Sequence, residues 1–536
     1  MKRIILFLLG IAIICGIANS LLVPNWNYPM YAENEGLKLI SLVKSSDTDI
    51  DVFFVGTSHM EQGVSPMVIY DEQKIVGYNL ATGSQPVEGS YYLIEEMFNN
   101  GYHPKLIIMD ASNLFLQETK EEGYRLITNN LRFGKSLIGM AKEYSDGDSS
   151  IPQHSLFFNV SGFIFPLMIY HDRWSGLNAS DFKSNISEKY FLQGYFNKPT
   201  IEASIANKES VDIVASMVIQ NQSFEADNKD EIADEPQYFT EINEKNQYYM
   251  EKIVQTCKDN SCEILLVKIP VMALASDYTS CWSLPRHKSV EKLASKLDIQ
   301  FLDVLYDTDV DIDWDHDSQD GGRHLNILGA EKVSKFLGEY ICDNYDIPTH
   351  NNQSYDRKLI LYEEYADVAH IEMSYNLVDY LTKLKNSDRE LEIFLSAKDD
   401  MISGLSEEEI AALNGLGLKT EFSNMEYNYS FIGVIDDGIP ELESVSNRKQ
   451  DYETTVLGDT VSITSAGYLD GSVSSILIND EEYSMNCRGI NIVVYDKKSG
   501  LIIDRAVCDT FDDVHEVIHR SDDLLYGFQE YLLGRN

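Results

Sequence analysis

Cysteine is scarce in this chain, with 7 residues among 536. Secreted domains that depend on disulfide bonds are far richer in cysteine, and zinc sites need paired Cys-x-x-Cys spacing, which the sequence lacks. These absences exclude a disulfide scaffold and a cysteine-based zinc site. Individual bridges stay open as an alternative: Cys487 and Cys508 flank an expected hairpin, whose register decides whether they meet.

Basic residues are also scarce, since 43 Lys and Arg stand against 86 Asp and Glu and give a formal net charge of -43. Such a surface repels a phosphate backbone, so we expect no nucleic-acid partner. Neutral glycans, cations and basic surfaces are compatible with this charge, and solubility outside the cell is its simplest explanation. The sequence also lacks repeats of solenoid period and low-complexity tracts, while its 44% hydrophobic content is that of a folded protein.

The N-terminus carries a long apolar run. After Met1-Lys2-Arg3, the stretch from Ile4 to Val23 has only two polar residues, and two glutamates follow soon after it. This length just spans a hydrocarbon core of roughly 30 Å, and the charges predict that the start lies inside and the bulk outside. We therefore expect residues 1–25 to be a transmembrane signal anchor of a single-pass cell-membrane protein whose bulk is extracytoplasmic. A signal peptide cleaved near Ala18 is the alternative.

Several apolar runs are continuous rather than alternating, which is typical of parallel strands buried on both faces. These runs are Val52 to Val55, Leu106 to Met109 and Glu263 to Ile269, and helical patterns at Val87 to Asn99 and Ala330 to Tyr345 lie between or after them. The alternation predicts an α/β fold over residues 45–345, with a doubly wound parallel sheet covered by helices on both faces.

The rest of the chain departs from this alternation. Residues from about 114 to 260 contain aromatic clusters and are expected to form a largely helical insertion. The polar segment 346–358 is expected to be a domain linker. Residues 359–536 are expected to be β-rich, with a hairpin that places Gly500 at positive φ. The six apolar runs that indicate strands there are Ile393 to Leu395, Tyr429 to Ile435, Val461 to Ser465, Ser475 to Ile478, Ile490 to Tyr495 and Leu501 to Val507.

The first buried run ends in Gly56-Thr57-Ser58 rather than in an ordinary turn. In an open α/β fold this serine stands at the carboxyl edge of the sheet, where ligands bind, and the next helix turns its N-terminal amides to the same place. The stretch alone leaves a helix N-cap and a nucleophile as equal interpretations of Ser58. Far downstream, His324 precedes a helix and Asp320 stands just before it. A nucleophilic serine needs such a base, and the base needs an acceptor that holds its tautomer.

Together these segments resemble the SGNH/GDSL hydrolase superfamily over roughly Asp51 to Tyr345, through the Gly-Thr-Ser near the start and His324-Leu-Asn-Ile-Leu-Gly-Ala near the end. The resemblance implies a flavodoxin-like parallel sheet and ester chemistry that needs no metal or organic cofactor. It assigns the nucleophile role to Ser58, the general-base role to His324 and the role of the triad acid to Asp320.

The acidic residues before His324 leave alternatives for the triad acid. The family usually has Asp three residues before the His, and Gly321 occupies that position here, so Asp317 and Asp315 compete with Asp320. Aspartates alternate from Asp307 to Asp317 in a manner reminiscent of a calcium loop. No glycine or glutamate at the required positions completes an EF-hand, so a solvated acidic loop and no metal site are expected.

The resemblance also implies an oxyanion site made from the nucleophile's own amide, a glycine amide and an Asn or similar side chain. Gly83, Asn79 and Gln85 follow an expected second strand and are the candidates, and Asn113 after the strand at Leu106 to Met109 is another. Each of these residues has turn chemistry as its alternative explanation.

A short segment of the insertion is suited to substrate binding. It contains His171, Arg173 and Trp174, and a planar cation beside an indole fits sugar rings and carboxylates. We therefore expect these three residues to line a substrate site.

The C-terminal part resembles the interleukin-like EMT inducer (ILEI/PANDER-type) domain over roughly Leu391 to Asp512. The segments Phe394 to Asp400, Tyr429 to Val434, Arg488 to Tyr495 and Asp509 to Phe511 carry the resemblance. It implies a compact sandwich-like β domain, and carbohydrate binding is known for some members.

These observations predict a membrane-anchored extracytoplasmic serine esterase or O-acyltransferase that acts on acyl groups, chiefly acetyl, of cell-envelope or extracellular glycans. Its expected partners are a glycan or polysaccharide substrate, the membrane and a membrane protein that supplies acyl groups. The alternative is a non-catalytic surface protein that binds glycans or proteins and carries a degenerate SGNH fold.

Overall fold

The computed structural model forms two compact units, each described by itself below. The first unit is Met1–Asn197 with Ala206–Leu359, and the second is Lys198–Ile205 with Ile360–Asn536. The residues that the structure describes are 2–22, 38–45, 47, 49–116, 121–147, 161–163, 167, 171–177, 191–196, 241–271, 282, 284–319, 322–402, 404–424, 428–511, 515–520 and 524–535.

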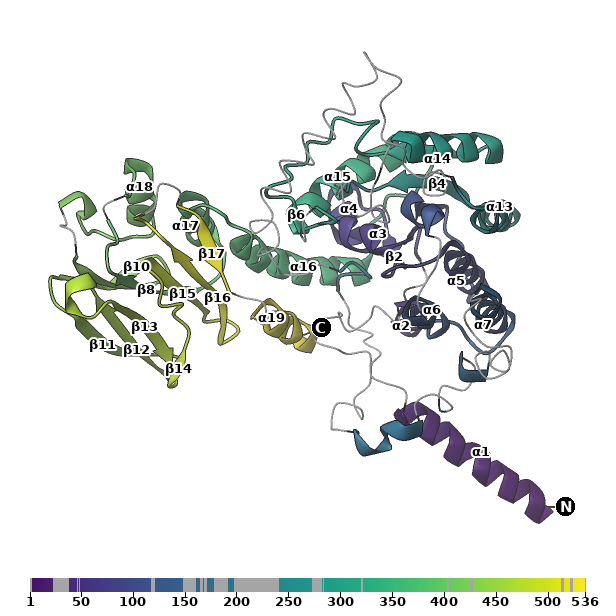
Figure 1. Ribbon diagram of the computed structural model, residues 1–536, viewed down its shortest axis with the longest axis horizontal. Helices are drawn as coiled ribbons and strands as arrows, with labels where there is room; N and C mark the ends of the chain where they lie inside the picture. The colour runs from purple at the N-terminus through teal and green to yellow at the C-terminus, as the bar shows by residue number, and fades with distance from the viewer. Residues whose placement is uncertain are drawn as a thin grey trace. The chain divides into compact units, whose positions relative to one another are not determined.

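A five-stranded parallel sheet organises the first unit, as predicted (Figure 1). Its strand order is β2-β1-β3-β4-β5, the order of flavodoxin-like doubly wound sheets. After β1 the chain first adds β2 on one side and then adds β3, β4 and β5 on the other, so the topological switch point lies between β1 and β3. The strands are β1 (Val52–Val55), β2 (Gly77–Asn79), β3 (Leu106–Asp110), β4 (Glu263–Lys268) and β5 (Gln300–Asp303).

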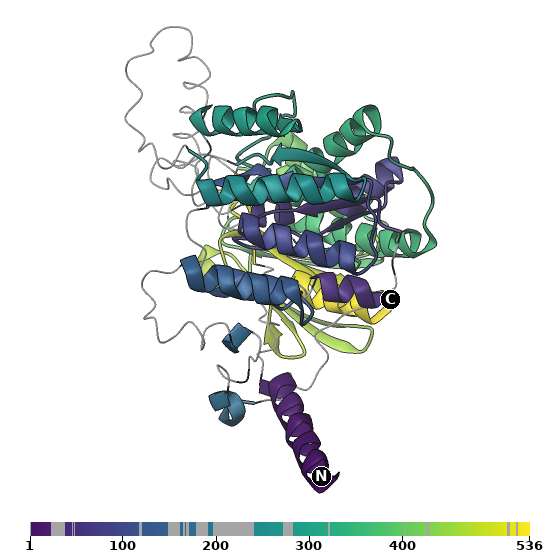
Figure 2. The same ribbon diagram turned by 90° about the vertical axis from the view of Figure 1, so that its right-hand side faces the viewer.

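Helices cover both faces of this sheet. On one face lie α3 (Ser58–Gly63), α4 (Pro66–Gln73) and α15 (Ile327–Asn344), with α15 against the other two. On the other face α5 (Val87–Asn99) and α13 (Glu244–Asp259) run side by side, with α7 (Lys135–Gly147) beyond α5 (Figure 2). The predicted helix at Val87 to Asn99 is α5, and the predicted helix near the end of the unit is α15.

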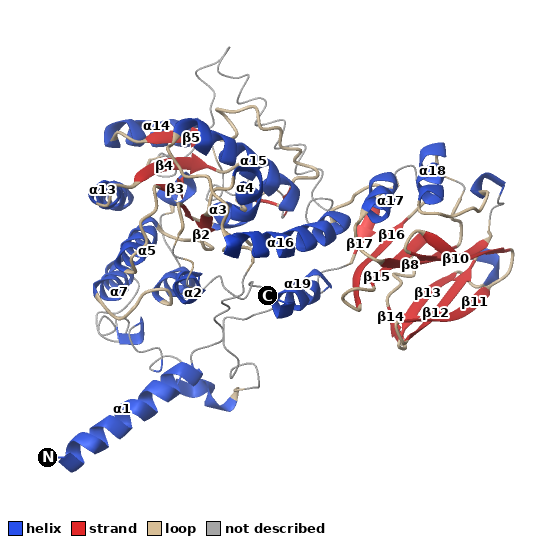
Figure 3. Cartoon of the chain, turned by 180° about the vertical axis from the view of Figure 1, so that it is seen from behind, coloured by secondary structure: helices blue, strands red, loops and turns tan. Residues whose placement is uncertain are grey.

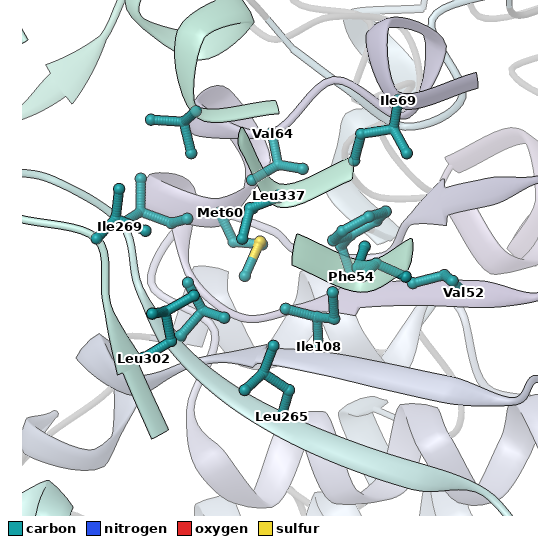
Figure 4. Close-up of a cluster of buried hydrophobic side chains, with 14 of the residues drawn as sticks. Val52, Phe54, Met60, Val64, Ile69, Ile108, Leu265, Ile269, Leu302 and Leu337 are labelled. Carbon is teal, nitrogen blue, oxygen red and sulfur yellow. The ribbon is translucent and has the colours of Figure 1, made fainter. Parts of the chain in front are cut away.

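The core between the sheet and the α3–α4–α15 face is apolar and fully buried (Figure 4). Alternate strand residues reach it because successive side chains of a strand point to opposite faces. Burying each Leu, Ile, Val or Phe side chain stabilises the folded state by about 1.5–3 kcal/mol relative to leaving it exposed to water. The labelled members include Val52, Phe54, Ile108 and Leu265 from the strands, Met60, Ile69 and Leu337 from the helices, and Val64 from the link between α3 and α4.

Shorter elements complete the first unit. The predicted insertion contributes helices where it is described, but α13 belongs to the crossover that returns the chain to β4, so the insertion ends before it. The remaining elements are α2 (Lys38–Ser45), η1 (Ala111–Phe115), α6 (Glu121–Thr128), η3 (His171–Ser175), α14 (Leu284–Leu297), β6 (Ser318–Gln319) and β7 (His324–Leu325).

The N-terminal helix α1 spans Lys2–Leu22 (Figure 3). In the described parts of the chain, no helix combines the length and the hydropathy needed to cross a bilayer.

The segment expected to be a linker packs on the first unit. The His350 amide donates to the Lys74 carbonyl at 3.0 Å, and the Tyr355 hydroxyl donates to the carbonyl of Gly77 in β2 at 2.8 Å. Helix α16 (Gln353–Glu372) begins within this segment, and the division between the two units falls inside α16, at Leu359 and Ile360.

The second unit is β-rich, as predicted, and its strands form one ten-stranded sheet. One edge of β8 pairs with β15, and its other edge is shared by β9 and β12. The strands are β8 (Leu391–Lys398), β9 (Ser430–Asp436), β10 (Ile439–Ser446), β11 (Gln450–Val456), β12 (Asp459–Ala466), β13 (Val473–Ile478), β14 (Glu481–Glu482), β15 (Gly489–Asp496), β16 (Leu501–Cys508) and β17 (Val517–His519). The helices are α17 (Leu377–Asn386), α18 (Glu407–Gly415) and α19 (Leu524–Arg535), with short η5 (Phe422–Asn424) and η6 (Tyr468–Asp470).

The predicted hairpin joins β15 to β16, and Gly500 has φ +71° in its turn. Cys508 lies opposite Ile490 rather than opposite Cys487, and both cysteines are free. The register therefore does not bring these two thiols together as a bridge.

Candidate active site

Ser58 lies where β1 ends and α3 begins, but it is not the N-cap of that helix. Thr57 is the N-cap: its Oγ1 accepts from the His59 amide at 3.3 Å and donates to the carboxylate of Asp110, at the end of β3, at 2.5 Å. The two interpretations of Ser58 are thereby separated, because capping falls to Thr57 and the Ser58 hydroxyl is available for another partner.

Gly56 allows β1 and β3 to approach closely just before Ser58. Its φ is +151°, and a Cβ at this position would lie 2.4 Å from Cβ of Asp110. Any side chain would collide with the next strand, so the residue is glycine for both conformational and steric reasons. The close approach lets Asp110 reach Thr57 and so fixes the start of α3.

His324 comes from the short antiparallel hairpin of β6 and β7, in which it pairs with Gln319. The Gln319 side-chain amide donates to the carbonyl of Leu325 at 3.1 Å and to Oε1 of Gln62, in α3, at 2.7 Å. This bridge ties the hairpin to the helix that begins with Ser58. The result is a hydrogen bond of 2.7 Å between His324 Nε2 and Ser58 Oγ, across 266 positions of sequence.

The proposed third member of the triad, Asp320, lies outside the described residues, as does Gly321. The competing Asp317 is engaged elsewhere, because its carboxylate accepts from Lys332 Nζ at 2.6 Å and from the Asp313 amide at 2.7 Å. The Asp317 carboxylate thus stabilises the backbone of the acidic loop at Asp313. The Asp315 amide donates to Asp313 at 3.1 Å in the same loop.

The predicted oxyanion side chains are buried and occupied. The Asn79 amide nitrogen donates to the carbonyls of Met60 and Val64, at 2.9 and 3.0 Å, and its oxygen accepts from the Ala81 amide at 3.0 Å. Asn79 therefore braces the loops around the site instead of facing it. This corrects the sequence-based role of Asn79, because the backbone of α3 and its exit supplies partners that the sequence does not reveal.

The other three candidates lie around the carboxyl ends of β1 and β3. Gln85 is buried, with its side-chain amide 3.0 Å from Thr82 Oγ1 and 2.9 Å from Ser90 Oγ. The Asn113 side chain donates to the same Ser90 hydroxyl at 3.2 Å. Gly83 is in the turn that follows Thr82, whose amide donates to the Gly56 carbonyl at 3.1 Å. Gly83 thus lies in a turn beside the end of β1, and its expected role as an oxyanion donor stays a prediction.

The residues predicted to bind substrate form η3 (His171–Ser175). Arg173 donates to the carbonyl of Leu22, at the end of α1, at 2.8 Å, and 72% of the Trp174 surface is exposed. Arg173 thus contacts the end of α1, and the expected role of the three residues in substrate binding stays a prediction.

Three residues beside the Ser58–His324 pair were not singled out in the sequence: His59, Ser112 and Lys268. Lys268 Nζ donates to Ser112 Oγ at 2.9 Å, and Ser112 Oγ lies 3.1 Å from His59 Nδ1. The rings of His59 and His324 lie 5.3 Å apart between centroids. The available signal was a lysine at the end of the apolar strand EILLVK, since lysine is almost never fully buried without a partner.

Electrostatics in this cluster follow from burial. Lys268 is 1% exposed, and burial lowers its pKa to about 8 even though the carboxylates of Asp110 and Asp303 favour its charged form. Desolvation, followed by the positive Lys268 and by His324, lowers the pKa of His59 well below its usual value. At neutral pH the site therefore combines a charged lysine with a neutral His59.

The described residues contain no group of three His, Cys, Asp or Glu side chains that is placed to hold a metal ion. The side chains of the acidic loop instead accept hydrogen bonds from backbone amides and lysine. The cluster around Ser58 consists of two serine hydroxyls, two imidazoles and an ammonium group.

The fold and site define a class: an α/β protein with a serine–histidine pair at the carboxyl edge of a parallel sheet. Comparison with known proteins adds no relative to this description, because no protein-family model matches the chain and no curated protein matches it significantly.

Proposed function

We propose that the protein is a serine esterase or O-acyltransferase of the SGNH type, acting on acyl groups, chiefly acetyl, carried by glycans. The observation that carries this proposal is the 2.7 Å hydrogen bond between Ser58 Oγ and His324 Nε2. A nucleophile and base within hydrogen-bond reach, at the switch point of a doubly wound sheet, are what acyl transfer requires.

In the proposed reaction, Ser58 Oγ attacks the ester carbonyl carbon while its proton passes to His324 Nε2. The carbonyl electron pair moves to oxygen, and the tetrahedral intermediate collapses when His324 returns the proton to the departing alkoxide. Water or a sugar hydroxyl then attacks the acyl-serine in the same way. Asp320 is the proposed acceptor that orients the imidazole.

Backbone amides are the proposed oxyanion donors. The amide of Ser58 opens helix α3, where unpaired N–H groups and the helix dipole favour negative charge. The Gly83 turn adjoins the end of β1 through the bond from Thr82 to Gly56. A single aligned donor contributes several kcal/mol to such a transition state.

Two features of the sequence support the glycan substrate and the extracytoplasmic location in this proposal. The ILEI-type resemblance of the second unit, together with its β-rich fold, supports a carbohydrate partner, and the apolar N-terminal segment supports a membrane-attached, extracytoplasmic protein with a membrane partner that supplies acyl groups. These parts of the proposal stay predictions.

The test is reaction of the purified full-length chain with a fluorophosphonate and with an acetylated polysaccharide. We expect labelling and acetate release in the wild type and loss of both in Ser58→Ala and His324→Ala. Ser295→Ala is the matched control, because Ser295 is an exposed residue of α14. Labelling that persists in Ser58→Ala would contradict the assignment.

The same assay separates the alternatives. Acyl transfer to an added sugar acceptor, without release of acetate, identifies a transferase. A wild-type protein that binds polysaccharide but reacts with neither probe identifies the non-catalytic binding protein.

A further inference from the structure

His59, Ser112 and Lys268 form a hydrogen-bonded row beside the Ser58–His324 pair. They come from three neighbouring elements at the carboxyl edge of the sheet: His59 from the first turn of α3, Ser112 from η1 after β3, and Lys268 from the end of β4. The distances are 2.9 Å from Lys268 Nζ to Ser112 Oγ and 3.1 Å from Ser112 Oγ to His59 Nδ1. The row therefore ends at a ring that directly follows the nucleophile in sequence.

The proton positions in this row follow from the chemistry of its members. A lysine ammonium group only donates, so Ser112 Oγ accepts from Lys268. The hydroxyl proton of Ser112 must then find another acceptor, and the acceptor that the described residues place within reach is His59 Nδ1. His59 thus carries its own proton on Nε2.

The charge of the row keeps this imidazole neutral. Lys268 is buried, and its other hydrogen bond, to the Ile269 carbonyl at 2.8 Å, also leaves it as a donor. A second positive charge on His59 would be repelled by Lys268 in a site of low dielectric. His59 therefore presents a neutral, oriented N–H group.

The His59 ring lies beside the ring of His324. Within the described residues Nε2 has no hydrogen-bond partner, and the side chain is partly exposed although its neighbour Met60 is buried. Its ring centroid is 5.3 Å from that of His324, whose Nε2 bonds to Ser58. Meanwhile Asn79, which the resemblance assigns as a side-chain donor, is fully engaged by backbone groups.

We propose that the Nε2–H of His59 donates a hydrogen bond to the oxyanion formed when Ser58 attacks an acyl group, and that Ser112 and Lys268 hold the ring in the tautomer that permits this donation. The inference rests on the proposed function. His59 is then a catalytic residue that keeps its proton throughout, while the Ser58 proton travels through His324. Ser112 and Lys268 are positioning residues.

The first experiment compares His59→Phe with His59→Gln in steady-state ester hydrolysis by the full-length chain. Phe has no donor, so kcat should fall by about 10²–10³ with KM nearly unchanged, the size observed when one oxyanion donor is removed. Gln offers an amide N–H and should recover at least about tenfold of that loss. Ser58-dependent hydrolysis that His59→Phe leaves unchanged overturns this inference alone, whereas absence of any Ser58-dependent hydrolysis in the wild type overturns the proposed function as well.

The second experiment begins with a measurement on the wild type, which depends neither on a variant nor on turnover. In wild-type protein labelled with ¹⁵N-histidine, the His59 ring should give the nitrogen shifts of a neutral Nε2–H tautomer at pH 7. Ser112→Ala should convert it to a mixture of tautomers and lower kcat by about tenfold. A charged ring, or an Nδ1–H tautomer in the wild type, overturns the proposal.

Discussion

Replacing Gly56 by alanine tests the contact that brings β1 and β3 together ahead of Ser58. The new Cβ would lie 2.4 Å from Cβ of Asp110 and 3.1 Å from its backbone nitrogen, at φ +151°. Backbone strain of about 1–3 kcal/mol and overpacking of about 1–3 kcal/mol add to an expected loss of about 2–6 kcal/mol in the free energy of unfolding. Neither strand can move away cheaply, because both are buried within the sheet.

Gly101→Ala is the matched control for the steric part of this loss. Gly101 also has positive φ, +88°, but a Cβ there meets nothing within 4 Å. It should therefore lose about 1–3 kcal/mol from strain alone.

Urea unfolding followed by tryptophan fluorescence measures the relevant unit, since all 4 tryptophans precede residue 320 and lie in the first unit. If Gly56→Ala loses no more stability than Gly101→Ala, the close approach of β1 and β3 is refuted.

Three further predictions concern buried polar groups. Lys38→Met should destabilise the first unit by about 3–5 kcal/mol because it removes the ammonium group that lies 2.5 Å from the buried Glu61 carboxylate, and adding Glu61→Leu should recover most of that loss in urea unfolding. Burial and the neighbouring carboxylates raise the pKa of Glu392 to about 7. Between about pH 4.5 and 7 the folded state therefore binds a proton that the unfolded state has lost, and the free energy of unfolding falls by about 3 kcal/mol as the pH rises through this window. Glu392→Gln should remove this pH dependence from urea unfolding measured across the window. Cys257 and Cys262 are buried, and the hydrogen bond between their thiols together with burial raises the pKa of Cys262. Both thiols should therefore resist alkylation at pH 7 until urea unfolds the chain, which peptide mass spectrometry measures.

Apolar strands were predictable because burial on both faces leaves a direct mark on the sequence. The runs at Val52 to Val55 and Leu106 to Met109 are β1 and β3, and the flanking helices follow the predicted alternation. The strands β10 and β11 were missed because they are largely exposed: segments such as IPELESVS and QDYETTV offer few buried apolar side chains, and their pairing with β9 and β12 defines them.

The site was predictable only in part, for a related reason. Strand-end position and the residue types suffice to bring Ser58 and His324 together, and the structure confirms their proximity. Sequence does not separate adjacent Thr57 and Ser58 as caps, because both residue types cap helices well and the deciding partner, Asp110, is on another strand. Lys268 likewise gains its significance from contacts across the sheet.

The hairpin that carries His324 is made 266 positions after Ser58. At synthesis rates of about 5–20 residues per second, roughly 13–53 s pass between the appearance of the hydroxyl and that of its imidazole. During this interval the Ser58 hydroxyl lacks its imidazole partner, and a prematurely terminated polypeptide never gains it. The Ser58–His324 pair therefore forms only after all five strands of the parallel sheet have been synthesised, so its assembly reports that the first unit has folded as a whole.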